Sequence, residues 1–239
     1  MKLLLSFFIF IWCQMNFAAV DYYGYHEATQ VPEPMFYDLV RGLHSKKGEF
    51  EANTLFYQQA SNELRSLHAA PEIEWVPADN WGVELELPSS HGKVEALKLA
   101  LQHGFDRSQR SFVDGLQLIL ERNLEHHHTE GKLTYLMGKR FPRRWSAFAI
   151  VGLAIEGPAQ QVKEVTNLSV FYDVLRRVDF GAELNLVTRG GSSEFLQFLP
   201  QAHLALDEKM KVQLGTGVQY LAQRWYSTGA LRLIREWNL

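Results

Sequence analysis

The chain has 239 residues, of which 21% are charged, with a formal net charge of -3 at pH 7 and a mean hydropathy of -0.18. The slightly acidic balance argues against nucleic acid as a partner. No apolar run after residue 19 is long enough for a transmembrane helix. These values leave open a membrane β-barrel, whose strands are only half apolar, and a single domain is the default at this length.

Residues 1–19, MKLLLSFFIFIWCQMNFAA, combine one lysine, a short apolar run and small residues at the end. This pattern predicts a secretory signal peptide cleaved near Ala18 or Ala19, and it is favoured over a membrane anchor helix because the apolar run is short. The only cysteine, Cys13, lies inside it, so the exported chain would have no disulfide. With no phosphate loop, dinucleotide fingerprint or haem motif, no cofactor is expected.

Residues 20–46 do not alternate like a strand. Met35, Phe36, Leu39, Val40 and Leu43 follow the spacing of an amphipathic helix, with a proline at position 34 suited to its first turn. The segment is therefore predicted to be periplasmic and to contain a short helix. It would either pack at the periplasmic mouth of the fold, which is the more common use of an apolar helix face, or act as a plug or gate.

From residue 47 onward, apolar and polar residues alternate with the period of β-strands. Two leucine-rich segments, 97–101 and 116–120, also fit helical spacing. Counting these two as strands gives about twelve, an even number as in closed bacterial barrels. The sequence thus predicts an all-β fold over residues 47–239, a transmembrane antiparallel up-and-down barrel with strands near 50–56, 72–75, 81–87, 97–101, 116–120, 133–137, 145–153, 168–172, 178–186, 196–204, 209–220 and 231–239.

The connections suggest an orientation. One set of turns is mostly tight, whereas 123–131, 188–193 and 222–229 are read as longer outer loops, as in outer-membrane barrels. Location in a Gram-negative outer membrane implies contact with outer-membrane lipids and insertion by the barrel assembly machinery. Aromatic residues at the inner strand ends all occupy positions whose side chains would point outward from the barrel. They predict an aromatic girdle at the membrane interface, made of Trp75, Trp81, Phe141, Trp145, Tyr172 and Trp237.

Several predicted strands have residue patterns similar to those of one group of bacterial barrels. These are ELELP at 84–88, LKLAL at 97–101, LPQAHLAL at 199–206 and QLGTGVQY at 213–220. In these segments the chain resembles uncharacterised outer-membrane transporter proteins of the phenol-degradation meta-pathway type. The resemblance implies a barrel that passes small molecules and carries over no binding residue. The terminal Leu239, where phenylalanine is usual, and residues 20–46 depart from the pattern.

If the apolar faces point outward, charged side chains point into the lumen. An acidic wall would favour cations or amine-bearing solutes by electrostatic focusing. Alternatively, glutamates could pair with lysines and arginines to brace a closed structural barrel, which is favoured because charges in a narrow lumen tend to pair. The predicted lumen residues are Glu49, Glu51, Glu72, Glu74, Glu84, Glu86, Lys98, Glu121, Lys163, Asp179, Glu183, His203, Lys211, Arg232 and Glu236.

These features favour a channel or transporter-like protein for small solutes over an enzyme. An outer-membrane lipid hydrolase using Ser89, Ser90 and His91 is the first alternative, although no G-x-S-x-G elbow is present. A soluble secreted β-sandwich is another alternative. Three adjacent histidines, His126, His127 and His128, form a weak metal candidate because their spacing is not that of a preorganised site.

Overall fold

The computed structural model describes residues 31–37, 39–60, 65–105, 111–175 and 177–238. The predicted signal peptide and residues 20–30 lie outside the described residues. Two strands of two residues, β4 (Ser89–Ser90) and β5 (Lys93–Val94), form a small hairpin. The long strands are β1 (Glu49–Ala60), β2 (Arg65–Ala78), β3 (Trp81–Glu86), β6 (Ala96–Gly104), β7 (Phe112–Asn123), β8 (Thr129–Arg140), β9 (Trp145–Glu156), β10 (Gln161–Leu175), β11 (Val178–Arg189), β12 (Ser192–Ala205), β13 (Met210–Leu221) and β14 (Arg224–Asn238).

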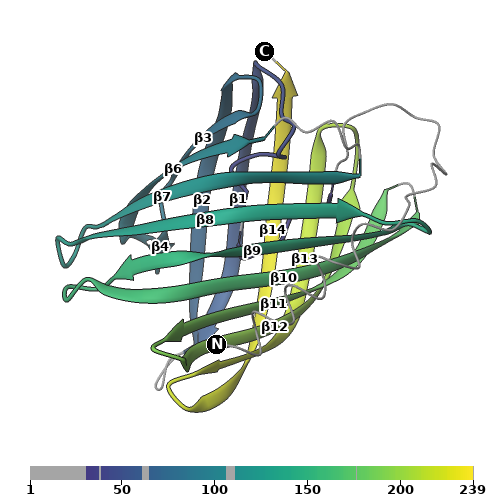
Figure 1. Cartoon of the computed structure of the whole chain (residues 1–239). Helices are drawn as coiled ribbons and strands as arrows, with labels where there is room; N and C mark the ends of the chain where they lie inside the picture. Colours follow the sequence, from purple (N-terminus) through teal and green to yellow (C-terminus); the bar gives the residue numbers. More distant parts are fainter. Residues whose placement is uncertain (1–30, 38, 61–64, 106–110, 176, 239) are drawn as a thin grey trace.

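The twelve long strands form one closed antiparallel barrel (Figure 1). Each pairs with the next long strand along the chain, and β1 pairs with β14 from Glu49 opposite Asn238 to Tyr57 opposite Ala230. Closure leaves no unpaired sheet edge, which is what a strand-built membrane protein needs. The predicted twelve-stranded up-and-down barrel is confirmed, and both ambiguous leucine-rich segments are strands, β6 and β7.

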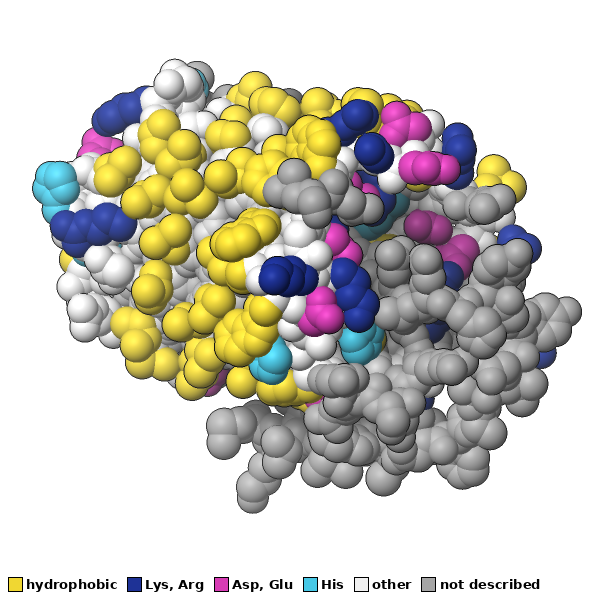
Figure 2. Space-filling view, turned by 90° about the horizontal axis from the view of Figure 1, so that it is seen from above, with side chains coloured by type: hydrophobic (Ala, Val, Ile, Leu, Met, Phe, Trp, Pro, Cys, Tyr) yellow, Lys and Arg dark blue, Asp and Glu magenta, His cyan; other side chains and the backbone are white. Residues whose placement is uncertain are grey.

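The distribution of side chains is inverted relative to a water-soluble protein. Apolar side chains such as Leu99 (49% exposed) and Leu153 (54%) cover the outside, whereas polar ones such as Asn185 (0%) line the inside. Figure 2 shows the hydrophobic side chains gathered in a broad band over the outer face. Exposing leucine at this scale would be unfavourable in water, so the outer face is suited to lipid.

Among the described residues, no helix is long and apolar enough to cross a membrane.

The helix predicted from Met35 to Leu43 is not formed in the described residues of that segment, which make bends and turns. A helix would have its amide groups bonded to carbonyls four residues earlier. Here the amides of Met35 and Val40 instead bond to side chains of the barrel wall, on Glu183 and Gln102. Tertiary hydrogen bonds have replaced the local ones.

Two of the three predicted outer loops, 188–193 and 222–229, are also wrong. The β11–β12 connection is Gly190 and Gly191, and the β13–β14 connection is Ala222 and Gln223. All four residues have positive φ, between 49° and 86°, the conformation of two-residue hairpin turns. The strands therefore extend through stretches that the sequence suggested were loops. We call the end where β1 begins and β14 ends the terminal end, and the other the distal end.

Candidate functional site

The glutamates of the first three strands line the inner face of the barrel. Glu51 on β1, Glu72 and Glu74 on β2, and Glu84 and Glu86 on β3 are all between 1% and 8% exposed. The amide Nδ2 of Asn53 donates to Glu51 Oε1 and Glu74 Oε1, both at 2.9 Å. Buried charge in a membrane barrel needs such partners, because an unpaired carboxylate would be strongly disfavoured.

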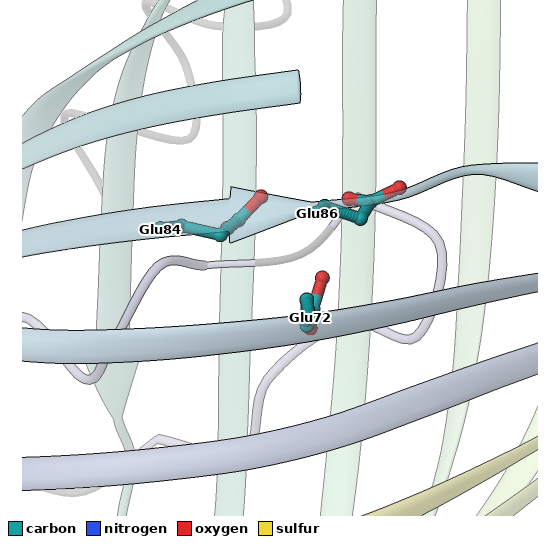
Figure 3. Close-up of side chains that lie close together, drawn as sticks. All are labelled: Glu72, Glu84 and Glu86. Carbon is teal, nitrogen blue, oxygen red and sulfur yellow. The ribbon is translucent and has the colours of Figure 1, made fainter. Parts of the chain in front are cut away.

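Three of these carboxylates converge. Glu72 points toward Glu84 and Glu86 from the neighbouring strand (Figure 3), and their oxygens lie within 4.8 Å of one another. Lys98 on β6 lies against the group, with its Nζ 3.0 Å from Glu84 Oε1 and a further hydrogen bond to Glu86. Because β3 pairs directly with β6, with Glu86 opposite Lys98, this lysine is the cation of the cluster.

The other predicted lumen residues form separate groups around the wall. Lys163 Nζ is 2.9 Å from Glu156 and 3.1 Å from Glu194, and Lys211 Nζ is 2.8 Å from Glu236. Asp179 and His203 are register partners on β11 and β12, and His203 Nε2 is 2.9 Å from Gln201 Oε1. The remaining predicted positions, Glu49, Glu121, Glu183 and Arg232, contribute to the features described next.

The N-terminal segment occupies the lumen. We call residues 31–37 and 39–47 the plug. Its apolar side chains are deeply buried: Met35 and Val40 are 0% exposed, Leu39 2% and Leu43 4%. The sequence favoured packing at the mouth over a plug, but these residues pack against inward-facing side chains of the barrel wall.

One carboxylate anchors the start of the plug. Glu183, fully buried on β11, accepts backbone amides from three successive residues: Met35 at 2.7 Å, Phe36 at 3.2 Å and Tyr37 at 3.3 Å. Arg232 on β14 completes the anchor by donating to the carbonyl oxygen of Met35 at 2.9 Å. Amide bonds to an ionised acceptor are about twice as strong as neutral ones, so this contact holds the plug firmly.

Side-chain amides of the barrel wall donate hydrogen bonds to Glu183 and fix its position. Asn167 Nδ2 donates at 2.8 Å, Asn185 Nδ2 at 2.9 Å and Gln201 Nε2 at 3.4 Å. The carboxylate is therefore oriented toward the plug by β10, β11 and β12, and its charge is shared among many donors.

A second set of contacts fixes the middle of the plug. Gln102 on β6 accepts from the amide of Val40 at 3.1 Å and donates through its own amide to the carbonyl oxygen of Arg41. The guanidinium of Arg41 bonds to Glu51 and lies 3.1 Å from Glu49 and 3.7 Å from Glu236. Arg41 thus lies among three carboxylates, two on β1 and one on β14. The sequence analysis did not identify Arg41, although it is a cation next to an apolar stretch that precedes an acidic strand.

Inward-facing glycines make room for the plug. A Cβ at Gly104 would lie 1.9 Å from the Leu43 carbonyl oxygen, one at Gly115 would lie 2.8 Å from Leu43 Cδ2, and one at Gly82 would lie 2.9 Å from Val40 Cγ1. Contacts below about 3.0 Å are not tolerated by packed atoms. The plug therefore touches the wall at positions where only glycine fits. Glycines at inward positions of the strands are the sequence signal that could have revealed the plug.

Beyond the plug, toward the distal end, the lumen widens into a cavity of about 400 Å³, which we call the vestibule. Its floor includes Phe36 and Tyr37 of the plug. Tyr57 packs edge-on against Phe36 at 5.5 Å between ring centroids. Six carboxylates and three cations line it: Glu72, Glu86, Glu95, Glu121, Glu130 and Glu156, and Lys98, Lys132 and Arg232.

The hydrolase candidates do not assemble a catalytic site. Ser89 Oγ donates to the carbonyl oxygen of Ala69, and His91 is a turn residue with φ 51°. A different pair meets in the vestibule wall, where Ser66 Oγ is 2.7 Å from His68 Nε2. The acid next to it, Glu95, is 3.9 Å from His68 Nδ1, beyond hydrogen-bonding distance, so the orientation that a triad requires is missing.

The three histidines lie in the distal β7–β8 loop. His128 Nε2 is 2.8 Å from Glu130 Oε1, and its ring stacks on that of His126 at 6.1 Å. His127 is exposed, with φ 54°. Within the described ranges, the group of acidic and histidine side chains close enough to share an ion is Glu72, Glu84 and Glu86, not this loop.

Aromatic side chains ring the terminal end on the outside. The Trp145 and Tyr172 rings lie 4.8 Å apart, and Trp75, Trp81 and Phe141 are between 37% and 48% exposed. Trp237 is half-buried and lies beneath the guanidinium of Arg235, at 5.9 Å. Such rings suit the boundary between lipid tails and headgroups.

Arg235 is a charged residue with outward parity on the last strand, where an apolar side chain would be expected. It lies near the strand end, 3.9 Å from Asp207 in the β12–β13 turn. Backbone amides of Lys209 and Met210 bond to Asp207 and hold the pKa of this carboxyl below its usual range. The arginine thus reaches an anionic partner beyond the apolar band, as snorkelling predicts.

Solved structures with a similar fold are bacterial outer-membrane proteins. The chain is similar to the KdgM porin, with 11% identity and a TM-score of 0.63, over 77% of this chain and 98% of that one. It is similar to an outer membrane channel from Pseudomonas putida F1, with 13% identity and a TM-score of 0.62, over 82% and 98%. For the NanC porin the values are 6% and 0.60, over 80% and 100%.

At such low identities the TM-scores show a shared barrel fold and nothing more, and the narrower resemblance to phenol-degradation transporters stays a prediction. No curated protein is similar enough in sequence to match. A family model described as HAEPLYID-like matches residues 28–236, a span that takes in the whole plug and nearly all of the barrel. By that match, the chain belongs to the HAEPLYID-like family.

Proposed function

We propose that this protein is an outer-membrane channel for small solutes whose lumen is closed by the plug. The observation that carries the proposal is a polar, charged lumen occupied by a chain segment that is not part of the barrel wall. The plug is a separate segment that precedes β1, and the barrel is closed by its own strand pairing without it. A permanently solid core would be expected to come from the wall's own side chains.

The plug's contacts are suited to a reversible closure. Its polar anchors, to Glu183, Gln102 and the Arg41 partners, are groups that water could solvate if the segment moved away. Apolar burial holds it closed, with Leu39 and Leu43 packed against Val113 and Leu136. We propose that the terminal end faces the periplasm, so that the plug lies near the periplasmic side and the vestibule toward the outside.

A disulfide across the plug and wall tests the proposal. A Cβ built at Gly82 lies 3.4 Å from Val40 Cβ, just below the roughly 3.5–4.5 Å span of disulfide bonds. The only native cysteine is Cys13, in the predicted signal peptide, so V40C/G82C introduces the pair cleanly. In planar bilayers we expect intermittent conductance when the variant is reduced and none when it is oxidised.

Two controls make the result decisive. The single variants Val40→Cys and Gly82→Cys should be insensitive to oxidant. A variant lacking residues 31–46 should conduct continuously if it shows the heat-modifiable mobility of a folded barrel. Conductance unchanged by oxidation of V40C/G82C, or a folded plugless barrel that does not conduct, would refute the proposal.

The KdgM porin has been solved in complex with oligogalacturonate, a polyanion. The lumen described above is itself acidic, because buried glutamates outnumber the cations beside them, and would repel such a polyanion. The solute of this channel is therefore proposed to differ in charge from that ligand.

A further inference from the structure

We infer that the vestibule is a binding site for a small organic cation, namely an aliphatic amine with one or two ammonium groups. This inference rests on the proposed function, since it names the class of solute that the channel would admit. It is argued from the charges, the aromatic surface and the size of the vestibule.

The vestibule carries an excess of negative charge. Its six carboxylates face three cations, which leaves a formal excess of three negative charges. Partial enclosure by protein strengthens their field relative to open water. A dianion would meet this field with repulsion, whereas an ammonium group would be attracted.

One carboxylate of the vestibule has no direct hydrogen-bond partner among the described residues. Glu86 is bonded to Lys98, Glu130 to His128, and Glu156 to Lys163. Glu121 on β7 lines the same cavity and makes no direct hydrogen bond or ion pair with the described residues, although Lys98, its register partner on β6, and Lys132 attract it at longer range. Partly buried carboxylates normally have partners, so Glu121 has capacity for a donor brought by a solute.

Aromatic rings supply the second element of ammonium recognition. The Tyr57 ring stacks on His68 at 5.1 Å between centroids, next to Phe36. The site already holds one ammonium against a ring, since Lys132 Nζ lies 5.0 Å from the centroid of Tyr37. Cations are attracted to the faces of such rings within about 6 Å.

The size of the vestibule limits the solute. A volume of about 400 Å³ is at the lower end of the range for small-molecule pockets, roughly 300–1,000 Å³. A short diamine fits, with one ammonium near Glu121 and its methylenes against Tyr57. Because Phe36 and Tyr37 of the plug form the floor, the solute would wait there until the plug moves.

Calorimetric titration of the full-length protein in detergent tests the inference, using three four-carbon probes that differ in charge. Putrescine, the dication, should bind, whereas succinate, the dianion, and 1,4-butanediol, which is neutral, should not. Glu121→Gln keeps the side-chain volume and should weaken putrescine binding by about tenfold or more, the cost of a lost charged hydrogen bond. Glu208→Gln, on an exposed turn at the terminal end, should leave binding unchanged.

Equal or tighter binding of succinate, no binding of putrescine, or wild-type affinity in Glu121→Gln would overturn the inference. The oxidised V40C/G82C variant separates it from the proposed function, because the vestibule remains intact when the plug is locked. Putrescine binding by this variant is expected whether or not conductance responds to oxidation. If conductance does not respond to oxidation, the proposed cation site is still supported by putrescine binding. If putrescine does not bind, the proposed gating by the plug is unaffected.

Discussion

Replacing Glu183 by glutamine should release the plug while preserving the shape of the wall. Glutamine has nearly the same volume, but it keeps one neutral acceptor oxygen and puts an NH2 donor in place of the other, so the bonds from the amides of Met35, Phe36 and Tyr37 are weakened or lost. Hydrogen bonds to charged groups contribute about 1.5–3 kcal/mol each and neutral ones about 0.5–1.5 kcal/mol. Three bonds sharing two oxygens should together lose about 2–3 kcal/mol, which shifts the ratio of undocked to docked plug by roughly 30- to 150-fold.

Single-channel recording in planar bilayers measures this shift directly as the fraction of time spent open. Glu84→Gln is the matched control, because Glu84 is equally buried but makes its ion pair with Lys98 rather than with the plug. An open fraction that rises in Glu183→Gln and not in Glu84→Gln agrees with the reasoning. A folded Glu183→Gln barrel whose open fraction equals that of the wild type would show that this carboxylate does not hold the plug.

Two further substitutions test the wall and the rim. Gly104→Ala places a methyl group against the Leu43 carbonyl oxygen and should favour undocking by about 1–3 kcal/mol, measured as open fraction. Gly131→Ala, whose Cβ meets only Leu120 at 3.7 Å, should have no effect, and equal effects in the two would contradict the steric argument. Arg235→Leu removes a partly exposed ion pair and should lower the free energy of unfolding by less than about 1 kcal/mol in denaturant titrations. A loss above roughly 3 kcal/mol, typical of a broken buried pair, would mean that Arg235 faces the lumen.

In the proposed function, different wall residues serve closure and solute binding. Glu51 and Glu49 are paired with Arg41 of the plug, whereas Glu86 is paired with Lys98 of the wall. Glu121, in the vestibule, makes no direct ion pair with the described residues. The sequence left paired charges and an acidic pore as alternatives; paired charges are present in the described wall, and the acidic pore belongs to the proposal.

The alternating pattern by itself determined the barrel. A period of two assigns every residue of a strand to one face, so the outward Leu153 of β9 and the inward glutamates of β1, β2 and β3 follow from the sequence alone. The leucines of β6 and β7 also fitted a helix, and only the structure shows that they lie on strands. The same parity placed Arg235 outside and Arg232 inside. Residue types predicted the turns less well than the strands. Ala222 and Gln223, for example, adopt positive φ in a two-residue hairpin turn that neither residue type suggests.

Only the tertiary structure decided what fills the barrel. Residues 35–43 have helical spacing, but the amides that would make a helix are bonded instead to Glu183 and Gln102, which lie far away in sequence. Likewise, Lys98 joins the Glu84–Glu86 pair because β3 and β6 are neighbours, a relation set by strand pairing. Periodicity reports which face a side chain occupies. It does not report which distant group meets it there, since that depends on closure of the whole ring and on the segment inside it.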